Sequence, residues 1–274
     1  MRRLVAHRSL VLGAVLTGVI LAVALVSLVW TPFPPTRIDI LNKLAAPSLA
    51  HPLGTDPFGR DVLSMIMAGT VNTLSVALVA VGLGAAIGIP LGAACSAAGG
   101  WVDMAVMRVS DLAFAFPAVL TAVMITALAG PGQGNAVFAI ALFNIPVFAR
   151  VTRGAALAVR ELDFVVAARA TGRGEFAIMR RHVLPNISAV LLVQLTIQCA
   201  LAILADAGLS YLGLGTQAPA PSWGRMLNDA QTFIYAAPLL AVFPGVAIML
   251  AVLGLNLLGD GLRDVLDPRL TQRR

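Results

Sequence analysis

Six long apolar stretches decide what this chain can fold into. They cover residues 9–30, 70–98, 112–129, 136–151, 187–209 and 237–258. A helix of roughly 20 apolar residues crosses the hydrocarbon layer, in which every backbone N–H and C=O must be hydrogen-bonded by the protein itself. The composition of 59% hydrophobic and 12% charged residues lies far from that of soluble domains. We therefore predict an all-α polytopic membrane protein with six transmembrane helices.

The positive charges predict how these helices are oriented. If both termini are cytoplasmic, 15 of the 19 Lys and Arg residues lie inside, and only Arg37, Lys43, Arg60 and Arg225 lie outside. Cytoplasmic segments of membrane proteins carry such an excess of positive charge. We therefore place the N- and C-termini in the cytoplasm and the chain in the inner (plasma) membrane as a multi-pass protein.

The ends of the apolar stretches divide the chain into four parts. Residues 1–50 would hold the first transmembrane helix and the start of a periplasmic segment, and residues 51–69 an amphipathic periplasmic segment. Residues 70–259 would form the transmembrane domain, and residues 260–274 a cytoplasmic tail. The first apolar stretch is 22 residues long and is followed by Thr31-Pro32, whereas a signal peptide has a shorter apolar region that ends in a small-x-small cleavage site. We therefore expect an uncleaved helix rather than a signal peptide.

The second apolar stretch repeats small residues at every fourth position. Gly84, Gly88 and Gly92 belong to this repeat. Small residues four apart lie on one face of a helix, where they let another helix approach closely within the membrane. We therefore predict a helix-packing face here rather than a dinucleotide-binding fingerprint, which would not lie inside an apolar run.

One long polar segment, residues 163–186, interrupts the second half of the chain. Together with its flank from Arg150 it carries seven arginines and three acids. The pattern predicts two short helices joined at residues 171–174 and ended at Pro185. Such a segment would stand in the cytoplasm, where it would either meet a partner or only fix the topology.

The same segment resembles the EAA loop of ABC importer permeases. The matching positions are Ala167, Ala168, Gly172, His182, Leu184 and Pro185. The resemblance implies that the loop docks onto an ATPase subunit, with Gly172 as the hinge and Ala167 and Ala168 as a small surface for close docking. His182 is expected to pack or to cap a helix. Val166 stands where the family usually has glutamate.

Four further strings resemble the peptide and nickel subgroup of these permeases. They are HPLGTDPFGRDVLS at 51–64, DAGLSYLGLG at 206–215, PSWGRML at 221–227 and NLLGDGLRDVLDPRL at 256–270. In the first string, Asp56 is expected to N-cap a short helix with Pro57 at its first position. The chain is thus identified as a member of the dipeptide/oligopeptide/nickel ABC permeases (C-type subunit), which implies the type I (MetI-like) importer fold.

The resemblance also implies partners and a function. It implies a homologous second permease, two ATP-binding cassette ATPase subunits and an extracytoplasmic substrate-binding protein, in addition to membrane lipid. The complex would import di- or oligopeptides, and the alternatives are nickel and glutathione. The chain has no G-x-x-x-x-G-K-[ST] motif, and its one lysine, Lys43, lacks that context. We therefore expect no cofactor bound by this chain, and ATP used by the partners.

Other functional classes find less support in the sequence. A membrane-embedded enzyme would need a polar catalytic cluster, and we find no nucleophile–base motif and predict no catalytic residue. A channel would work without an ATPase. Dependence on a co-purifying nucleotide-binding subunit would therefore distinguish an ABC importer from a channel. No basic run is interleaved with aromatics, so we expect no nucleic-acid partner.

Three polar residues of the fifth apolar stretch are candidates for the substrate path, namely Gln194, Gln198 and Asp206. An ionisable group near hydrocarbon is expensive, which makes Asp206 a functional candidate that could pass a cationic group of the substrate. The alternative is an interface carboxylate that reaches water or caps a helix end. The scattered residues His7, His51, His182, Cys95 and Cys199 predict neither a metal site nor a disulfide.

Overall fold

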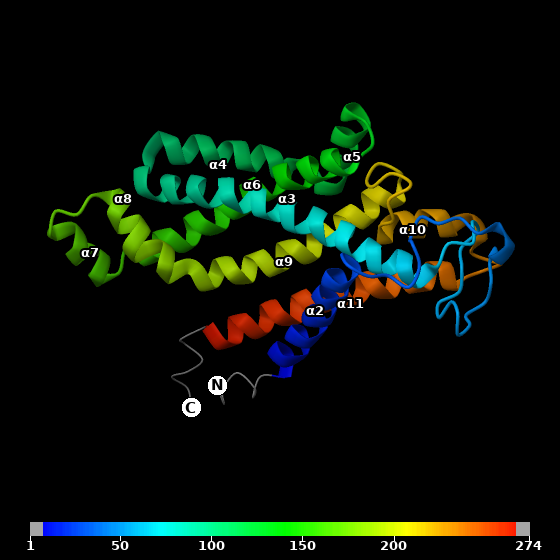
Figure 1. Ribbon diagram of the computed structural model, residues 1–274. Helices are drawn as coiled ribbons and strands as arrows, with labels where there is room; N and C mark the ends of the chain where they lie inside the picture. Colours follow the sequence, from blue (N-terminus) through cyan, green and yellow to red (C-terminus); the bar gives the residue numbers. More distant parts are fainter. Residues whose placement is uncertain (1–7, 267–274) are drawn as a thin grey trace.

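The computed structural model describes residues 8–266, and within this range the chain is helical without strands (Figure 1). Five helices are long and apolar enough to cross a membrane, one of them in continuity with a short helix before it. These are α2 (Arg8–Ser27), α3 (Val62–Ala98), α6 (Gln133–Arg160), α9 (Leu184–Tyr211) and α11 (Leu239–Leu266). The prediction of an all-α multi-pass protein is confirmed.

The third predicted span is broken rather than straight. Helices α4 (Gly100–Ala115) and α5 (Ala118–Ala129) together pass as one span but are bent by 85°. Phe116 between them is extended, with φ −103° and ψ 136°, and Pro117 follows it. Because the proline ring excludes the preceding residue from the helical region, the helix must end there. The single helix predicted over residues 112–129 is therefore wrong, but residues 8–266 still hold five candidate spans, or the predicted six if this bent pair crosses as one.

The glycine repeat of α3 lies directly against α6. A Cβ atom on Gly88 would be 2.5 Å from the Ile145 carbonyl oxygen, and one on Gly84 or Gly92 would also overlap α6. In lipid, helices associate through such close van der Waals contact, because hydrocarbon gives no hydrophobic drive between them. This contact therefore joins the first and second halves of the transmembrane part.

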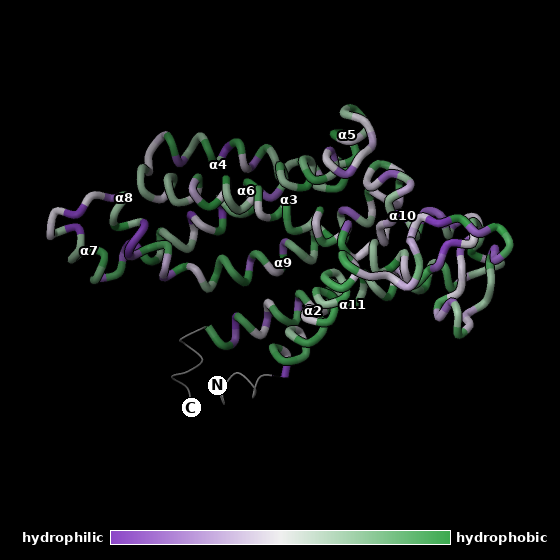
Figure 2. Tube along the Cα trace, viewed as in Figure 1, coloured by the Kyte–Doolittle hydropathy of each residue, from purple (hydrophilic) through white to green (hydrophobic). Residues whose placement is uncertain are grey.

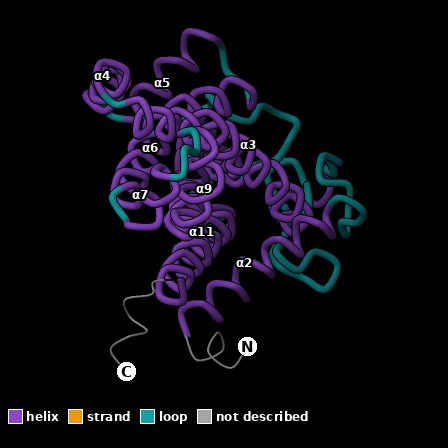
Figure 3. Tube along the Cα trace, turned by 90° about the vertical axis from the view of Figure 1, so that its left-hand side faces the viewer, coloured by secondary structure: helices purple, strands orange, loops and turns teal. Residues whose placement is uncertain are grey.

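The first helix, α2, packs along the inner half of α11. Antiparallel neighbours are Leu10 beside Gly261 and Thr17 beside Gly254. Gly13 lies beside Leu258 in the same antiparallel register. Figure 3 shows α11 between α2 and α9, so α2 is a peripheral helix.

Helix α3 begins at Val62 and not at residue 70. Its N-cap is Asp61, whose carboxylate accepts hydrogen bonds from the Ser64 amide at 2.8 Å and hydroxyl at 2.7 Å. His51 Nδ1 lies 2.9 Å from the same carboxylate. Asp56 instead accepts from backbone amides of a turn, among them that of Arg60. The predicted Asp56 cap is therefore wrong, because the turn uses its carboxylate before any helix begins.

We expect Asp61→Ala to lower the free energy of unfolding by about 0.5–2 kcal/mol, the usual loss for a removed N-cap. The buried Ser64 hydroxyl would also lose its acceptor. Asp61→Asn keeps an acceptor for the cap, so its loss should be smaller. Thermal unfolding of the purified protein in detergent would measure both. Equal unfolding temperatures for wild type and Asp61→Ala would contradict this role of the cap.

Candidate functional site

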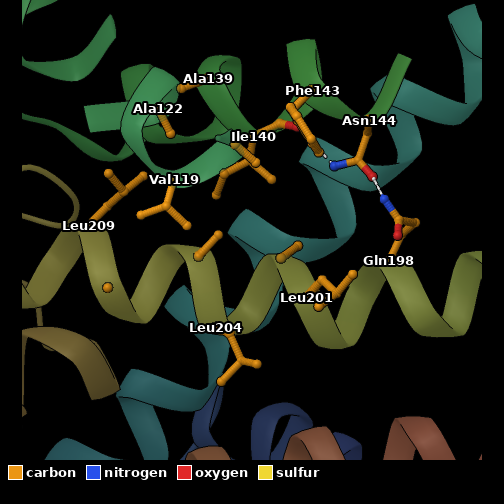
Figure 4. A pocket seen from close by; sticks show the side chains of 14 residues that line it. Val119, Ala122, Ala139, Ile140, Phe143, Asn144, Gln198, Leu201, Leu204 and Leu209 are labelled. Carbon is orange, nitrogen blue, oxygen red and sulfur yellow. Dashed lines mark hydrogen bonds between the residues drawn. The ribbon is translucent and has the colours of Figure 1, made fainter. Parts of the chain in front are cut away.

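A hollow of about 350 Å³ lies between α5, α6 and the second half of α9 (Figure 4). Its walls are mostly apolar, and no charged side chain lines it. The labelled lining residues include Val119, Ala122, Ile140, Phe143, Leu201 and Leu209. A molecule in this hollow would meet apolar walls from three different helices.

Two amides form the polar end of this hollow. Gln198 Nε2 donates to Asn144 Oδ1 at 2.7 Å, and Asn144 Nδ2 donates to the Ile140 carbonyl at 2.8 Å (Figure 4). Both side chains are buried. Within residues 8–266 no donor reaches Gln198 Oε1, while its NH₂ group is engaged. The pair therefore leaves one carbonyl oxygen that can accept a hydrogen bond from an occupant.

The structure separates the three polar residues that the sequence singled out on α9. Gln198 lines the hollow, whereas Gln194 and Asp206 are not among its lining residues. Asp206 is completely buried, with Oδ1 3.5 Å from Ser210 Oγ and Oδ2 without a partner in the described chain. The alternative that Asp206 reaches water is therefore wrong. Helix α10 (Trp223–Ala230) covers this end of α9, where Gly224 lies against Ala207.

The cytoplasmic loop has the two predicted helices, α7 (Asp163–Ala170) and α8 (Glu175–Ile178), with Gly172 at φ +80° in the turn between them. However, the helical structure does not end at Pro185. It continues through a π-helical turn, Met179–Val183, directly into α9. Pro185 lies in the first turn of α9, where a missing N–H is tolerated, so the predicted end at this residue is wrong.

The loop has a hydrophobic core of its own. Val165, Ile178 and Val183 are completely buried and belong to one cluster with Ala93 of α3 and Ala156 of α6. The loop is therefore packed on the inner ends of α3, α6 and α9. A displacement of the loop must move these helices, because a close-packed cluster transmits it.

Glu175 joins three helical segments of the loop by ion pairs. Its carboxylate lies 2.8 Å from Arg160 at the end of α6 and 2.7 Å from Arg169 in α7. The hydrogen bond to this carboxylate raises the pKa of Arg169. The sequence analysis did not predict the role of Glu175, although seven arginines beside only three acids indicate that one acid could be shared by two arginines.

The residues of the EAA-like pattern are exposed to different degrees. Ala167 and Val166 are exposed on the outward face of α7, whereas Ala168 packs against the core of the loop. His182 is half-buried, with Nε2 3.1 Å from Arg173 Nη1. Leu184 is half-buried, and Gly172 and Pro185 are exposed. Ala167 therefore belongs to the accessible surface of the loop, whereas Ala168 belongs to the packing beneath that surface.

No group of three or more His, Cys, Asp or Glu residues is placed to hold a metal ion in the part of the chain that the structure describes. His51 and His182 lie at opposite ends of the bundle, and His7 falls outside the described residues. Cys95 and Cys199 are free thiols in different helices.

Comparison with known proteins gives three findings. A family model described as "Binding-protein-dependent transport system inner membrane component" matches residues 84–272. The dipeptide transport system permease protein DppC of Alkalihalophilus pseudofirmus is 40% identical over 269 residues, which cover 98% of this chain and 88% of the relative. The glutathione transport system permease protein GsiD of Pectobacterium atrosepticum is 44% identical over 232 residues, 85% and 76% of the two chains.

The fold is also similar to a solved structure. The MetNI methionine ABC transporter in inward-facing conformations matches with a TM-score of 0.62 and 19% sequence identity. The match covers 74% of this chain and 96% of that chain. The arrangement of helices described above is therefore a fold shared with this methionine ABC transporter.

Proposed function

The chain belongs to the family of binding-protein-dependent transport system inner membrane components, and from this premise we propose that it forms half of the transmembrane path of a peptide importer. It is a permease subunit of an ABC importer in the inner membrane, and it is not an enzyme. Such a permease works with another permease, an ATPase and a substrate-binding protein. The substrate and the particular partners are the subject of the proposal.

We propose small peptides as the substrate class. The observation that carries this is the 40% identity to a dipeptide permease over 98% of the chain. The hollow between α5, α6 and α9 supports it, because an apolar wall with one free amide oxygen suits a peptide with varied side chains and backbone N–H donors. Glutathione, a tripeptide thiol, falls in the same chemical class and remains the alternative.

Nickel has less support as the substrate. No His, Cys, Asp or Glu residue lines the hollow, and transition metals prefer imidazole, thiolate or carboxylate ligands. A nickel ion held in a chelate would need no such ligand. A free nickel ion would have to take its ligands from the companion permease.

We further propose that the loop of α7 and α8 is the docking element for one of two ATPase subunits. A homologous second permease would complete the path, and ATP would be used by the ATPases alone. The exposed Ala167 would allow close approach of the ATPase, and Gly172 would set the angle between the two loop helices. Because the loop shares a core with α3, α6 and α9, closure of the ATPases would move the walls of the hollow.

Paired uptake measurements test the substrate class. A strain deleted for this chain would be given labelled di- and oligopeptides, glutathione or nickel in parallel. We expect loss of uptake of one peptide class, restored by the wild-type gene. Loss of nickel uptake alone would overturn the peptide proposal and identify nickel as the substrate.

We expect Gln198→Leu to lower the initial rate of peptide uptake about fivefold to tenfold. A net hydrogen bond contributes about 1 kcal/mol, and the substitution removes both the free acceptor and the partner of Asn144. Gln194→Leu, on the same helix but away from the hollow, serves as the control and should transport at the wild-type rate. Equal rates for the two variants would contradict a role of the amide pair in the path.

A further inference from the structure

The outer segment 38–49 exposes four large apolar side chains, and we name it the outer cap. The exposed fractions are 61% for Ile38, 63% for Ile40, 97% for Leu41 and 105% for Leu49. Figure 2 shows hydrophobic stretches in the loops at the end of the molecule that carries α10. Large apolar residues that are exposed and gathered in one short segment mark a surface for interaction.

The outer cap is a fixed structure, because backbone hydrogen bonds hold it to residues 54–60. The Asp39 amide donates to the Phe58 carbonyl, the Leu44 amide to the Asp56 carbonyl and the Thr55 amide to the Ala45 carbonyl, each at 3.0 Å. Gly59 has φ +74°, and a Cβ atom there would overlap the Asp39 backbone. The apolar side chains are thus presented on a rigid support, which reduces the entropy lost on binding.

An ionic network fixes this support on α10. Arg60 lies 2.6 Å from Asp56 and 3.4 Å from Asp229 of α10, and Asp229 also pairs with Arg225 at 3.0 Å. Four charged groups at one place are expensive in hydrocarbon. The network therefore indicates that the cap stands in an aqueous space.

The position of the outer cap along the bundle also places it in an aqueous space. Helix α3 has 37 residues and is therefore about 55 Å long, against a hydrocarbon layer of about 30 Å. The loops that precede α3 lie at the end of the bundle, beyond the outer end of α2 (Figure 1). The excess of arginine at the opposite end, around α7 and α8, makes the cap side the extracytoplasmic one. The exposed leucines are therefore presented above the membrane rather than to lipid.

We propose that the outer cap is a docking surface for the extracytoplasmic substrate-binding protein. The inference rests on the proposed function, since the family description itself requires a binding protein. Arg37 and Lys43 flank the apolar side chains and are exposed, and neither has an acidic partner within residues 8–266. The matching surface on the binding protein is therefore an apolar patch bordered by acidic residues.

The test uses the complete transporter in lipid nanodiscs and the binding protein whose addition stimulates ATP hydrolysis by the wild-type complex. We expect the double variant Leu41→Ser/Leu49→Ser to raise the Kd of this binding protein at least tenfold. Leu25→Ser, at a position of α2 that is 66% exposed, is the matched control and should leave the Kd unchanged. Arg37→Glu/Lys43→Glu should raise the Kd as well, and more strongly at low salt.

A fluorescent label distinguishes the other occupants of this surface. Leu41→Cys would be labelled with an environment-sensitive dye in a Cys95→Ala/Cys199→Ala background. A spectral shift on addition of the binding protein, without quenching by spin-labelled lipids, is the expected result. Quenching by lipid would overturn the proposal in favour of a membrane contact, and loss of the companion permease from the double variant would overturn it in favour of a permease–permease contact.

The outcomes also separate this proposal from the function on which it rests. If the wild-type complex is stimulated by a binding protein and the double variant binds it equally well, the outer cap is not the docking surface and the importer function stands. If no binding protein stimulates the wild-type complex, the proposed function fails and this inference fails with it.

Discussion

Gly88→Leu is expected to remove the protein from the membrane almost completely. A Cβ atom at this position would lie 2.5 Å from the Ile145 carbonyl oxygen and 2.7 Å from Phe148 Cβ. The obstruction is mainly backbone, which cannot turn aside as a flexible side chain can. Overpacking usually costs about 1–3 kcal/mol, and we expect at least the upper end here. The amount of folded protein in membranes and its thermal unfolding in detergent would measure the effect.

Gly82→Leu is the matched control for this prediction, since Gly82 lies in the same helix and a Cβ atom there would meet nothing within 4 Å. Both variants change helix propensity equally, so only the contact with α6 differs. Wild-type stability is expected for Gly82→Leu. Equal losses in the two variants would mean that glycine matters for the helix itself and not for its approach to α6.

Ala167→Arg is expected to uncouple ATP hydrolysis from uptake. Ala167 is exposed on the outward face of α7, where a long charged side chain would hold an ATPase subunit away from the loop. Its backbone is supported by the buried core around Val165, so the loop itself should keep its fold. We expect at least a tenfold fall in uptake per ATP hydrolysed. Reconstituted transporter would give uptake and hydrolysis in one preparation.

The control for this second prediction is Ala98→Arg. Ala98 is also exposed and lies at the cytoplasmic end of α3, outside the loop. Ala98→Arg adds the same charge on the same side of the membrane. Because Ala98 lies outside the loop, this variant should show normal coupling of ATP hydrolysis to uptake. Normal coupling in Ala167→Arg would show that α7 does not carry the docking surface.

Several features of the loop and of the membrane helices could be predicted because their causes are local. The turn at Gly172 follows from a residue that accepts positive φ, and the face of Gly84, Gly88 and Gly92 follows from a four-residue repeat. The bend before Pro117 also has a local cause in the proline itself. Hydropathy alone did not predict it, because residues 112–129 form one continuous apolar run.

Other features could not be predicted because they depend on groups distant in sequence. Whether Asp206 meets water depends on α10, whose Gly224 packs on α9 at Ala207. The hydrogen bond between Asn144 and Gln198 joins α6 to α9 through two residues that are 54 positions apart in the sequence. Neither arrangement leaves a periodic signal in the chain.

The amino-acid sequence by itself determined that this protein crosses the membrane, on which side its arginine-rich loop stands and which glycine face packs. These properties follow from transfer free energies, the distribution of Lys and Arg residues and helical periodicity, all of which can be read from the chain before it folds. Only the tertiary structure decided which polar groups face the hollow, that Glu175 bridges Arg160 and Arg169, and that the outer cap is rigid yet exposed. Those properties arise from contacts between segments, and a contact exists only when the helices have packed.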